Sequence, residues 1–137
     1  MAGKQSRIAI IDDDESVRRA IRRLFVSSGL RAEVFASGRD FLDSLARGRP
    51  DCIVLDLQMP GLNGVEVLNA LARAGLRVPA IIVTGHDEPE SRMRCLAAGA
   101  AAYLCKPFDD AALLRAVGEV VGDSGSAPTS RPVARTD

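Results

Sequence analysis

The decisive stretch of this sequence is Ile53-Val54-Leu55-Asp56-Leu57-Gln58-Met59-Pro60-Gly61. Its apolar run is typical of a strand that is buried on both faces, as strands of parallel sheets are. The Pro-Gly pair predicts a sharp turn directly afterwards. In open α/β sheets, ligands bind in the crevice beyond the carboxyl ends of the strands. We therefore expect Asp56 to be a reactive group, although a single aspartate at this place more often caps the following turn.

The rest of the chain alternates between short apolar runs and stretches of helical periodicity. Predicted strands begin near residues 7, 31, 52, 80 and 102, and predicted helices cover about 16–28, 41–48, 63–75, 89–99 and 109–121. This alternation is typical of a parallel sheet with helices on both faces. Right-handed crossovers require the winding to reverse once, which for five strands gives the order 2-1-3-4-5. We predict one α/β domain, a doubly wound (βα)5 fold of the flavodoxin type.

The length and composition agree with one domain. With 137 residues, of which 47% are hydrophobic, the chain can bury one core. Residues 1–5 form a short polar arm, and residues 122–137 have almost nothing to bury. We therefore predict a folded domain over residues 6–121 and a flexible tail or linker over 122–137.

Charge and hydropathy exclude several classes of partner. Eighteen basic residues balance eighteen acidic ones, so we expect no direct binding of nucleic acid and no attraction to a membrane surface. No run reaches the roughly 18 apolar residues of a membrane span, and no signal peptide is visible, so we predict a cytoplasmic protein. The three cysteines show neither paired nor metal-type spacing, so we predict reduced thiols that pack in the core. We expect one cluster of arginines to form a solvated helix face: Arg18, Arg19, Arg22 and Arg23.

Polar side chains follow four of the predicted strands. Because strands one and three are neighbours in the predicted order, Asp12 and Asp13 should meet Asp56, with Thr84 and Lys106 at the next two strand ends. Carboxylates this close need a cation, or one pKa would rise sharply. Oxygen ligands without a His or Cys cluster indicate Mg²⁺, because a dedicated Ca²⁺ site calls for more oxygens.

This set of groups suits phosphoryl transfer. A carboxylate beside Mg²⁺ can attack phosphorus and form an acyl phosphate, and we assign that role to Asp56. Lys106 and Thr84 would neutralise and bond phosphoryl oxygens. The acidic run continues to Asp14, so if the first strand ended one residue later, the roles assigned to Asp12 and Asp13 would pass to Asp13 and Asp14. We favour Asp12 and Asp13 because Ile11 ends the apolar run, which leaves Asp14 to cap the next helix.

Over about residues 5–121 these motifs resemble those of the two-component response-regulator receiver domain, the fold of chemotaxis receivers and of the receivers of DNA-binding response regulators. The residues that carry the resemblance are Asp12-Asp13, Asp56, Thr84 and Lys106-Pro107. The resemblance implies that Asp56 accepts a phosphoryl group from a sensor histidine kinase. It also implies Asp13 as a direct Mg²⁺ ligand with Asp12 as its outer companion, a metal contact from the main-chain carbonyl of Gln58, and a cis Lys106-Pro107 bond.

The same resemblance implies a switch. Thr84 would move toward the phosphoryl group and Tyr103 would turn inward, with plain core packing of Tyr103 as the alternative. The surface formed by the fourth helix, fifth strand and fifth helix would then bind an output partner or a second receiver. Gln58 and His86 stand where receivers adjust the lifetime of the phosphoryl group, and we expect His86 to be an exposed loop residue. Gly85 stands where the family more often has alanine, and we expect it to open the site and alter the kinetics of phosphorylation.

Two other classes of function share part of this chemistry. An aspartate-nucleophile phosphohydrolase usually has an acid two residues after the nucleophile, where this chain has Gln58. A binding module that is never phosphorylated would be expected to lack one of the site groups, and all are present. We therefore predict a phosphoacceptor rather than an enzyme, limited to self-catalysed phosphorylation and slow autodephosphorylation. Both a stand-alone receiver and the receiver part of a transcription regulator remain open.

Overall fold

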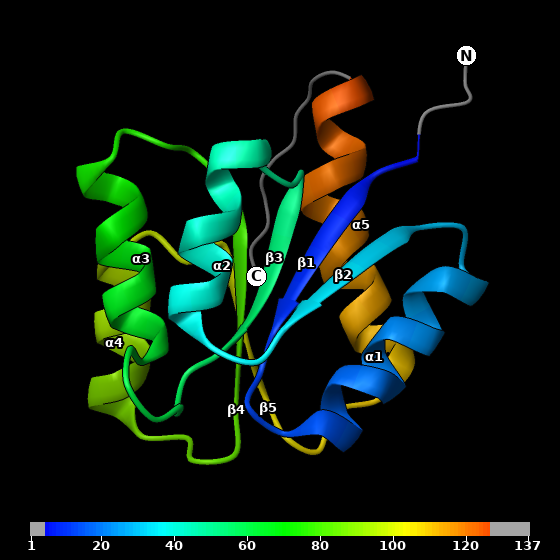
Figure 1. Cartoon of the computed structure of the whole chain (residues 1–137). Coiled ribbons are helices and arrows are strands. Elements are labelled where there is room, and N and C mark those ends of the chain that lie inside the picture. Colours follow the sequence, from blue (N-terminus) through cyan, green and yellow to red (C-terminus); the bar gives the residue numbers. More distant parts are fainter. Residues whose placement is uncertain (1–4, 127–137) are drawn as a thin grey trace.

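The computed structural model describes residues 5–126, and its centre is one parallel sheet (Figure 1). The strand order is β2-β1-β3-β4-β5, as the alternation of the sequence predicts. All four neighbouring pairs are parallel, and β1 lies between β2 and β3. The strands are β1 (Arg7–Ile11), β2 (Arg31–Phe35), β3 (Cys52–Asp56), β4 (Ala80–Thr84) and β5 (Ala102–Cys105).

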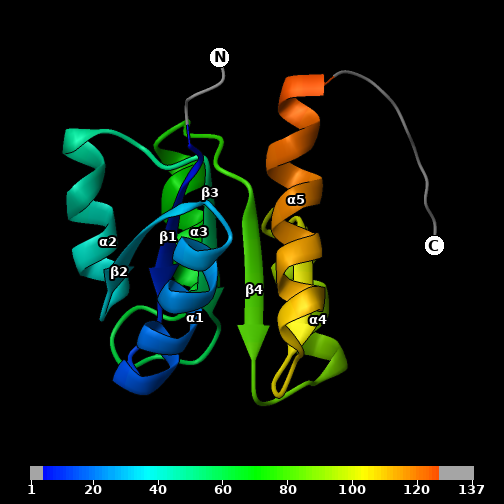
Figure 2. The ribbon, with the colours of Figure 1, turned by 90° about the vertical axis from the view of Figure 1, so that its right-hand side faces the viewer.

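Five α-helices cover the two faces of the sheet. They are α1 (Glu15–Ser27), α2 (Gly38–Ser44), α3 (Gly64–Arg73), α4 (Pro89–Ala97) and α5 (Asp110–Ser126), with a 3₁₀ turn, η1 (Leu45–Arg47), after α2. Helices α1 and α5 lie on one face, whereas α2, α3 and α4 lie on the other (Figures 1 and 2). The predicted doubly wound fold, with one reversal of winding between β2 and β3, is confirmed.

The side chains of each strand divide between two hydrophobic clusters, because successive residues of a strand point to opposite faces. Ile8 and Ile10 of β1 pack with residues of α1 and α5. Ala9 and Ile11, the residues between and after them, pack with residues of α2, α3 and α4. Strands β3 and β4 are buried along their whole length, which explains their unbroken apolar runs.

Helices α1, α3 and α5 begin next to the strand ends with side-chain caps, whereas α4 begins after Glu88 without one. Asp14 accepts a hydrogen bond from the amide of Ser16 at the start of α1. Asn63 and Glu66 form a reciprocal capping box at the start of α3. Asp109 accepts a hydrogen bond from the amide of Ala112 at the start of α5. These three caps confirm the predicted helix starts, and they assign Asp14 to the helix rather than to the acidic site.

The structure differs from the sequence prediction at the end of the last helix. The apolar stripe ends at residue 121, but α5 continues to Ser126. A nucleated helix adds one hydrogen bond per residue, so it can outlast its apolar stripe. Residues 127–137 and 1–4 lie outside the described part, and the division into arm, domain and tail stays a prediction.

The prediction of three packed thiols is wrong for one cysteine. Cys52 and Cys95 are buried, but Cys105 is exposed. Cys105 is the last residue of β5, and β5 is an edge strand with a neighbour on one side only. Within residues 5–126 no helix combines the length and the apolar character that a membrane span requires.

Candidate functional site

The predicted site residues gather beyond the carboxyl ends of the central strands. Asp12 and Asp13 follow β1, Asp56 is the last residue of β3, and Thr84 is the last residue of β4. Lys106 follows β5. Strands β1 and β3 are direct neighbours, with Ile11 opposite Leu55, so the two acidic segments emerge side by side.

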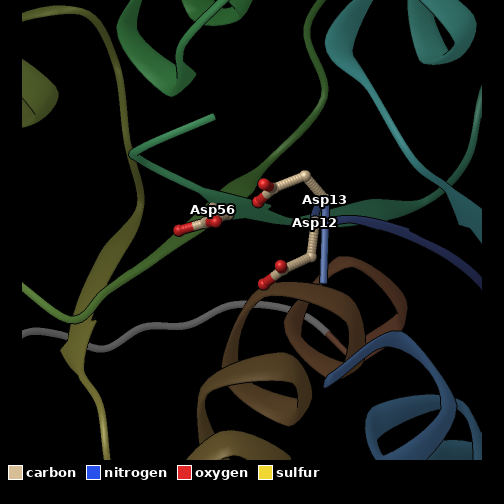
Figure 3. A group of neighbouring side chains, drawn as sticks. All are labelled: Asp12, Asp13 and Asp56. Atoms are coloured by element: carbon tan, nitrogen blue, oxygen red, sulfur yellow. The ribbon is translucent and has the colours of Figure 1, made fainter. Parts of the chain in front are cut away.

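Three carboxylates form the centre of this site (Figure 3). One oxygen of Asp12, one of Asp13 and one of Asp56 all lie within 4.8 Å of one another. Asp12 is only 2% exposed and Asp56 5%, whereas Asp13 is exposed. This arrangement offers a cation a set of oxygen ligands, which is the kind that Mg²⁺ prefers.

Asp12 is held at all of its polar groups. Its amide donates to the carbonyl of Phe35 at 3.1 Å. Its Oδ1 accepts from the amide of Asp14 at 2.9 Å, and its Oδ2 accepts from Nζ of Lys106 at 3.2 Å. Its carbonyl accepts from Nη1 of Arg18 at 2.8 Å. Asp12 is therefore anchored by four contacts, one at each of its polar atoms.

Asp13 has the opposite character. Its carboxylate makes no hydrogen bond or ion pair with the rest of residues 5–126, and it faces solvent. Because its oxygens are not committed to other groups, Asp13 can contribute a ligand directly to a cation that the three carboxylates share. The direct and outer roles that the resemblance implies for Asp13 and Asp12 stay a prediction.

Asp56 is buried with few donors. Its Oδ1 accepts one long hydrogen bond, 3.4 Å, from the amide of Gln58, and lies 3.7 Å from Nζ of Lys106. Burial and, next, the negative charge of Asp12 raise the pKa of Asp56 to about 6. This is the electrostatic state expected of a carboxylate cluster without a cation, so a bound divalent ion would relieve it.

Lys106 links the two acidic strand ends. Its ammonium pairs with Asp12 at 3.2 Å and with Asp56 at 3.7 Å. The Lys106-Pro107 bond is cis, as the resemblance implies. A phosphoryl group on Asp56 would therefore have a cation within reach.

Thr84 is fully buried, and its hydroxyl is turned to its own loop. It donates to the carbonyl of His86 at 3.2 Å and accepts from the amide of His86 at 3.0 Å. His86 is exposed, as predicted. A Cβ atom added at Gly85 would meet no atom within 4 Å beyond its chain neighbours, so space at this position is open.

Tyr103 is half-buried against the cluster on the α3 and α4 face. Its hydroxyl is buried and has no hydrogen-bond partner within the described residues. The guanidinium of Arg92 lies 5.4 Å from the centre of its ring, a cation–π distance. Burial, and then the negative charge of Asp87, raise the pKa of Tyr103. Tyr103 therefore packs as a core residue, with its hydroxyl close to the carboxylate of Asp87.

Sequence reasoning missed one contributor to the site. The pattern places Arg18 on a solvated helix face, yet its guanidinium bonds the carbonyl of Asp12. Arg19, its neighbour in the sequence, is exposed as predicted. The position of Arg18 in the sequence could have indicated this contact, because Arg18 lies one turn into the helix that follows the acidic segment.

Comparisons with known proteins agree with this geometry. The model of the family called Response regulator receiver domain matches residues 8–118. Nodulation protein W of Bradyrhizobium diazoefficiens is 38% identical over 116 residues, which cover 85% of this chain and 51% of that protein. The transcriptional regulatory protein FixJ of Azorhizobium caulinodans is 41% identical over 120 residues, which cover 85% of this chain and 56% of that protein. The chain thus spans about half the length of these curated relatives.

Solved structures show the same fold. A response regulator receiver protein from Burkholderia phymatum is 48% identical with a TM-score of 0.77, and the match covers 91% of this chain and all of that one, 100%. The chemotaxis protein CheY4 of Vibrio cholerae is 28% identical with a TM-score of 0.80, and the match covers 85% of this chain and 99% of that one.

Proposed function

The chain belongs to the response-regulator receiver family, and on that premise we propose that Asp56 accepts a phosphoryl group from the histidine of a sensor kinase in a Mg²⁺-dependent reaction. The observation that carries the proposal is the meeting of the two acidic strand ends, with Lys106 bridging Asp12 and Asp56. The kinase and its receiver would meet in the cytoplasm.

In the transfer, an oxygen of Asp56 bonds to phosphorus while the bond from phosphorus to the donor's imidazole nitrogen breaks. The electron pair of that bond stays on the nitrogen, which then takes a proton. The phosphoryl group passes through a metaphosphate-like state whose charge lies on its oxygens. Lys106, whose Nζ lies 3.7 Å from Asp56, would neutralise one of these oxygens, and the hydroxyl of Thr84 would bond another once it leaves His86.

The residues present fit a Mg²⁺ ion. Asp13 and Asp56 would hold it directly, together with the main-chain carbonyl of Gln58, while the committed oxygens of Asp12 would act from outside the direct ligand set. When bound, the ion would neutralise charge shared by the carboxylates and the phosphoryl oxygens. Its ligands are all oxygens, as Mg²⁺ requires.

The output of this site would be a change of the α4-β5-α5 surface. Movement of Thr84 toward a phosphoryl group would break its bonds to His86, which precedes α4, and by the resemblance Tyr103 would then turn inward. Met93 and Leu96 of α4 are 69% and 50% exposed, so this surface already presents apolar side chains to a partner. We propose that it binds an output partner or a second receiver, and that this chain does not itself contact nucleic acid.

We further propose a phosphoacceptor rather than a multiple-turnover enzyme, with slow autodephosphorylation whose rate Gln58 and His86 adjust, while Gly85 affects the kinetics of phosphorylation. Two of the relatives support a regulatory setting, since one is named a transcriptional regulatory protein and both are about twice as long as the match. The chain would act as a stand-alone receiver or as the receiver part of such a regulator.

The test is labelling with acetyl phosphate in Mg²⁺, followed by intact mass. We expect the mass of one phosphoryl group per chain, slow decay, and no labelling of Asp56→Asn or of wild type in EDTA. Rapid release of phosphate would instead indicate a hydrolase. A wild-type chain that binds Mg²⁺ but takes up no label would indicate a binding module.

A further inference from the structure

Arg18 is the arginine of α1 that turns toward the acidic site. Its Nη1 donates to the carbonyl of Asp12 at 2.8 Å, and the contact is partly buried. Arg19 lies one residue further along the same helix, is exposed, and makes no hydrogen bond or ion pair through its side chain within residues 5–126. The two side chains therefore carry the same charge on the same helix but differ in this bond and in burial.

The carbonyl that Arg18 holds is the point at which the chain leaves β1. Asp12 is 2% exposed, and its carbonyl accepts no other hydrogen bond from the described residues. A buried carbonyl without a donor is unfavourable, so loss of the arginine would favour rotation of this peptide toward another donor or toward water.

Rotation of that peptide would move Asp13. A peptide unit is planar, so a change in the ψ angle of Asp12 moves the carbonyl oxygen of Asp12 and the Cα of Asp13 together. The carboxylate of Asp13 has no hydrogen bond of its own to residues 5–126, and its place is set by the main chain beneath it. The bond from Arg18 therefore helps to fix the distance between the carboxylate oxygens of Asp13 and Asp56.

We propose that Arg18 is a positioning residue of the cation site: by holding the Asp12–Asp13 peptide plane, it keeps the carboxylate of Asp13 within reach of the cation that Asp56 shares. This inference rests on the proposed Mg²⁺-dependent function. Groups that orient metal ligands without touching the metal commonly contribute about 10- to 100-fold in affinity. Arg18 acts through the backbone instead of through a ligand's own side chain, so we expect a change in Mg²⁺ affinity at the lower end of this range.

The experiment compares three variants with wild type. Arg18→Met keeps the length of the side chain and removes the donor, Arg19→Met removes the same charge from the same helix, and Arg18→Lys keeps the charge and one donor. Mg²⁺ is titrated into each metal-free protein while the backbone amide signals of Asp13 and Gln58 are followed by NMR. We expect the dissociation constant to rise about tenfold in Arg18→Met, to stay within about twofold in Arg19→Met, and to recover to within about threefold in Arg18→Lys.

A second readout separates positioning from loss of folding. At saturating Mg²⁺ the labelling rate of Arg18→Met with acetyl phosphate should return to within about threefold of wild type, because the cation itself then draws Asp13 into place. Urea unfolding without Mg²⁺ establishes that the titrated variants are folded. If Arg18→Met does not fold, rotation of the guanidinium of Arg18 in the wild type, measured by ¹⁵N NMR, should still be slower than that of Arg19.

Equal Mg²⁺ affinities of Arg18→Met and wild type would overturn the inference. Equal weakening in Arg18→Met and Arg19→Met would also overturn it, because the effect would then be long-range charge. Guanidinium rotation as free at Arg18 as at Arg19 would do the same. In all three cases wild type would still bind Mg²⁺ and be labelled at Asp56, whereas failure of the proposed function would appear in the wild type itself.

Discussion

The ends of β1 and β3 lie side by side and both carry aspartate, yet they hold it in opposite ways. Asp12 is bonded at its amide, its carbonyl and both side-chain oxygens. Asp56 is as deeply buried but accepts one hydrogen bond of 3.4 Å and has Lys106 at 3.7 Å. At the end of β1 the carboxylate of Asp12 is thus fixed by its hydrogen bonds, whereas at the end of β3 the charge of the Asp56 carboxylate is poorly compensated. A group in that state gains most from a cation or from reaction with a phosphoryl group.

The largest expected effect comes from removing the group that spans both ends. Lys106→Met should lower the rate of labelling by acetyl phosphate at saturating Mg²⁺ by about 100-fold, because a cation at the reacting oxygens is lost. The measurement is intact mass against time. Arg115→Met, which removes a positive charge from an exposed position of α5, serves as the control and should label like wild type. A rate for Lys106→Met close to that of wild type would show that the ammonium does not act in the transfer.

The next effect concerns the charge of Asp56 itself. Its pKa is raised to about 6 in the folded chain from 3.8, so between these values the folded state binds more protons and the free energy of unfolding falls as pH rises. In EDTA above pH 7, Asp56→Asn should therefore be more stable than wild type by roughly 2–3 kcal/mol. Urea unfolding from pH 4 to pH 8 measures this, and the difference should shrink as pH falls through about 6. Added Mg²⁺ should also narrow it, because only wild type would bind the ion well.

A gain in stability that is the same at pH 4 and pH 8 would contradict this explanation. It would mean that the amide improves packing, and that burial of the charge is not the cause.

The smallest effect tests how the main chain at the β3 end is confined. A Cβ on Gly64 would lie 3.0 Å from the carbonyl oxygen of Asp56 and 3.0 Å from Cα of Leu57, both backbone atoms that cannot move freely. Gly64→Ala should cost about 1–2 kcal/mol in urea unfolding, since α3 must shift away from the strand end. Gly118→Ala, at a helical position where a Cβ meets nothing within 4 Å, should instead stabilise by about 0.5–1 kcal/mol. Equal changes in both variants would show that α3 accommodates the methyl group without strain.

Much of the molecule could be predicted because strand ends and helix caps are encoded locally. The apolar run before Asp56, the acids after Ile11 and the caps Asp14 and Asn63 follow from period and residue type, and the structure confirms the strand order and the caps. For the end of α5 and the exposure of Cys105 the sequence prediction is wrong, because they depend on helix propagation and on an edge position that no local pattern marks.

The amino-acid sequence was sufficient for the order of the strands and for the residues at their carboxyl ends, because hydrophobic periodicity and the handedness of crossovers leave few alternatives. Three-dimensional packing was needed to distinguish Asp12, whose polar groups are all bonded, from Asp56, whose charge is not compensated, and to turn Arg18 toward the site. The reason is physical: hydrogen bonds and charge compensation depend on distances of a few ångströms between side chains, and spacing along the chain does not specify them.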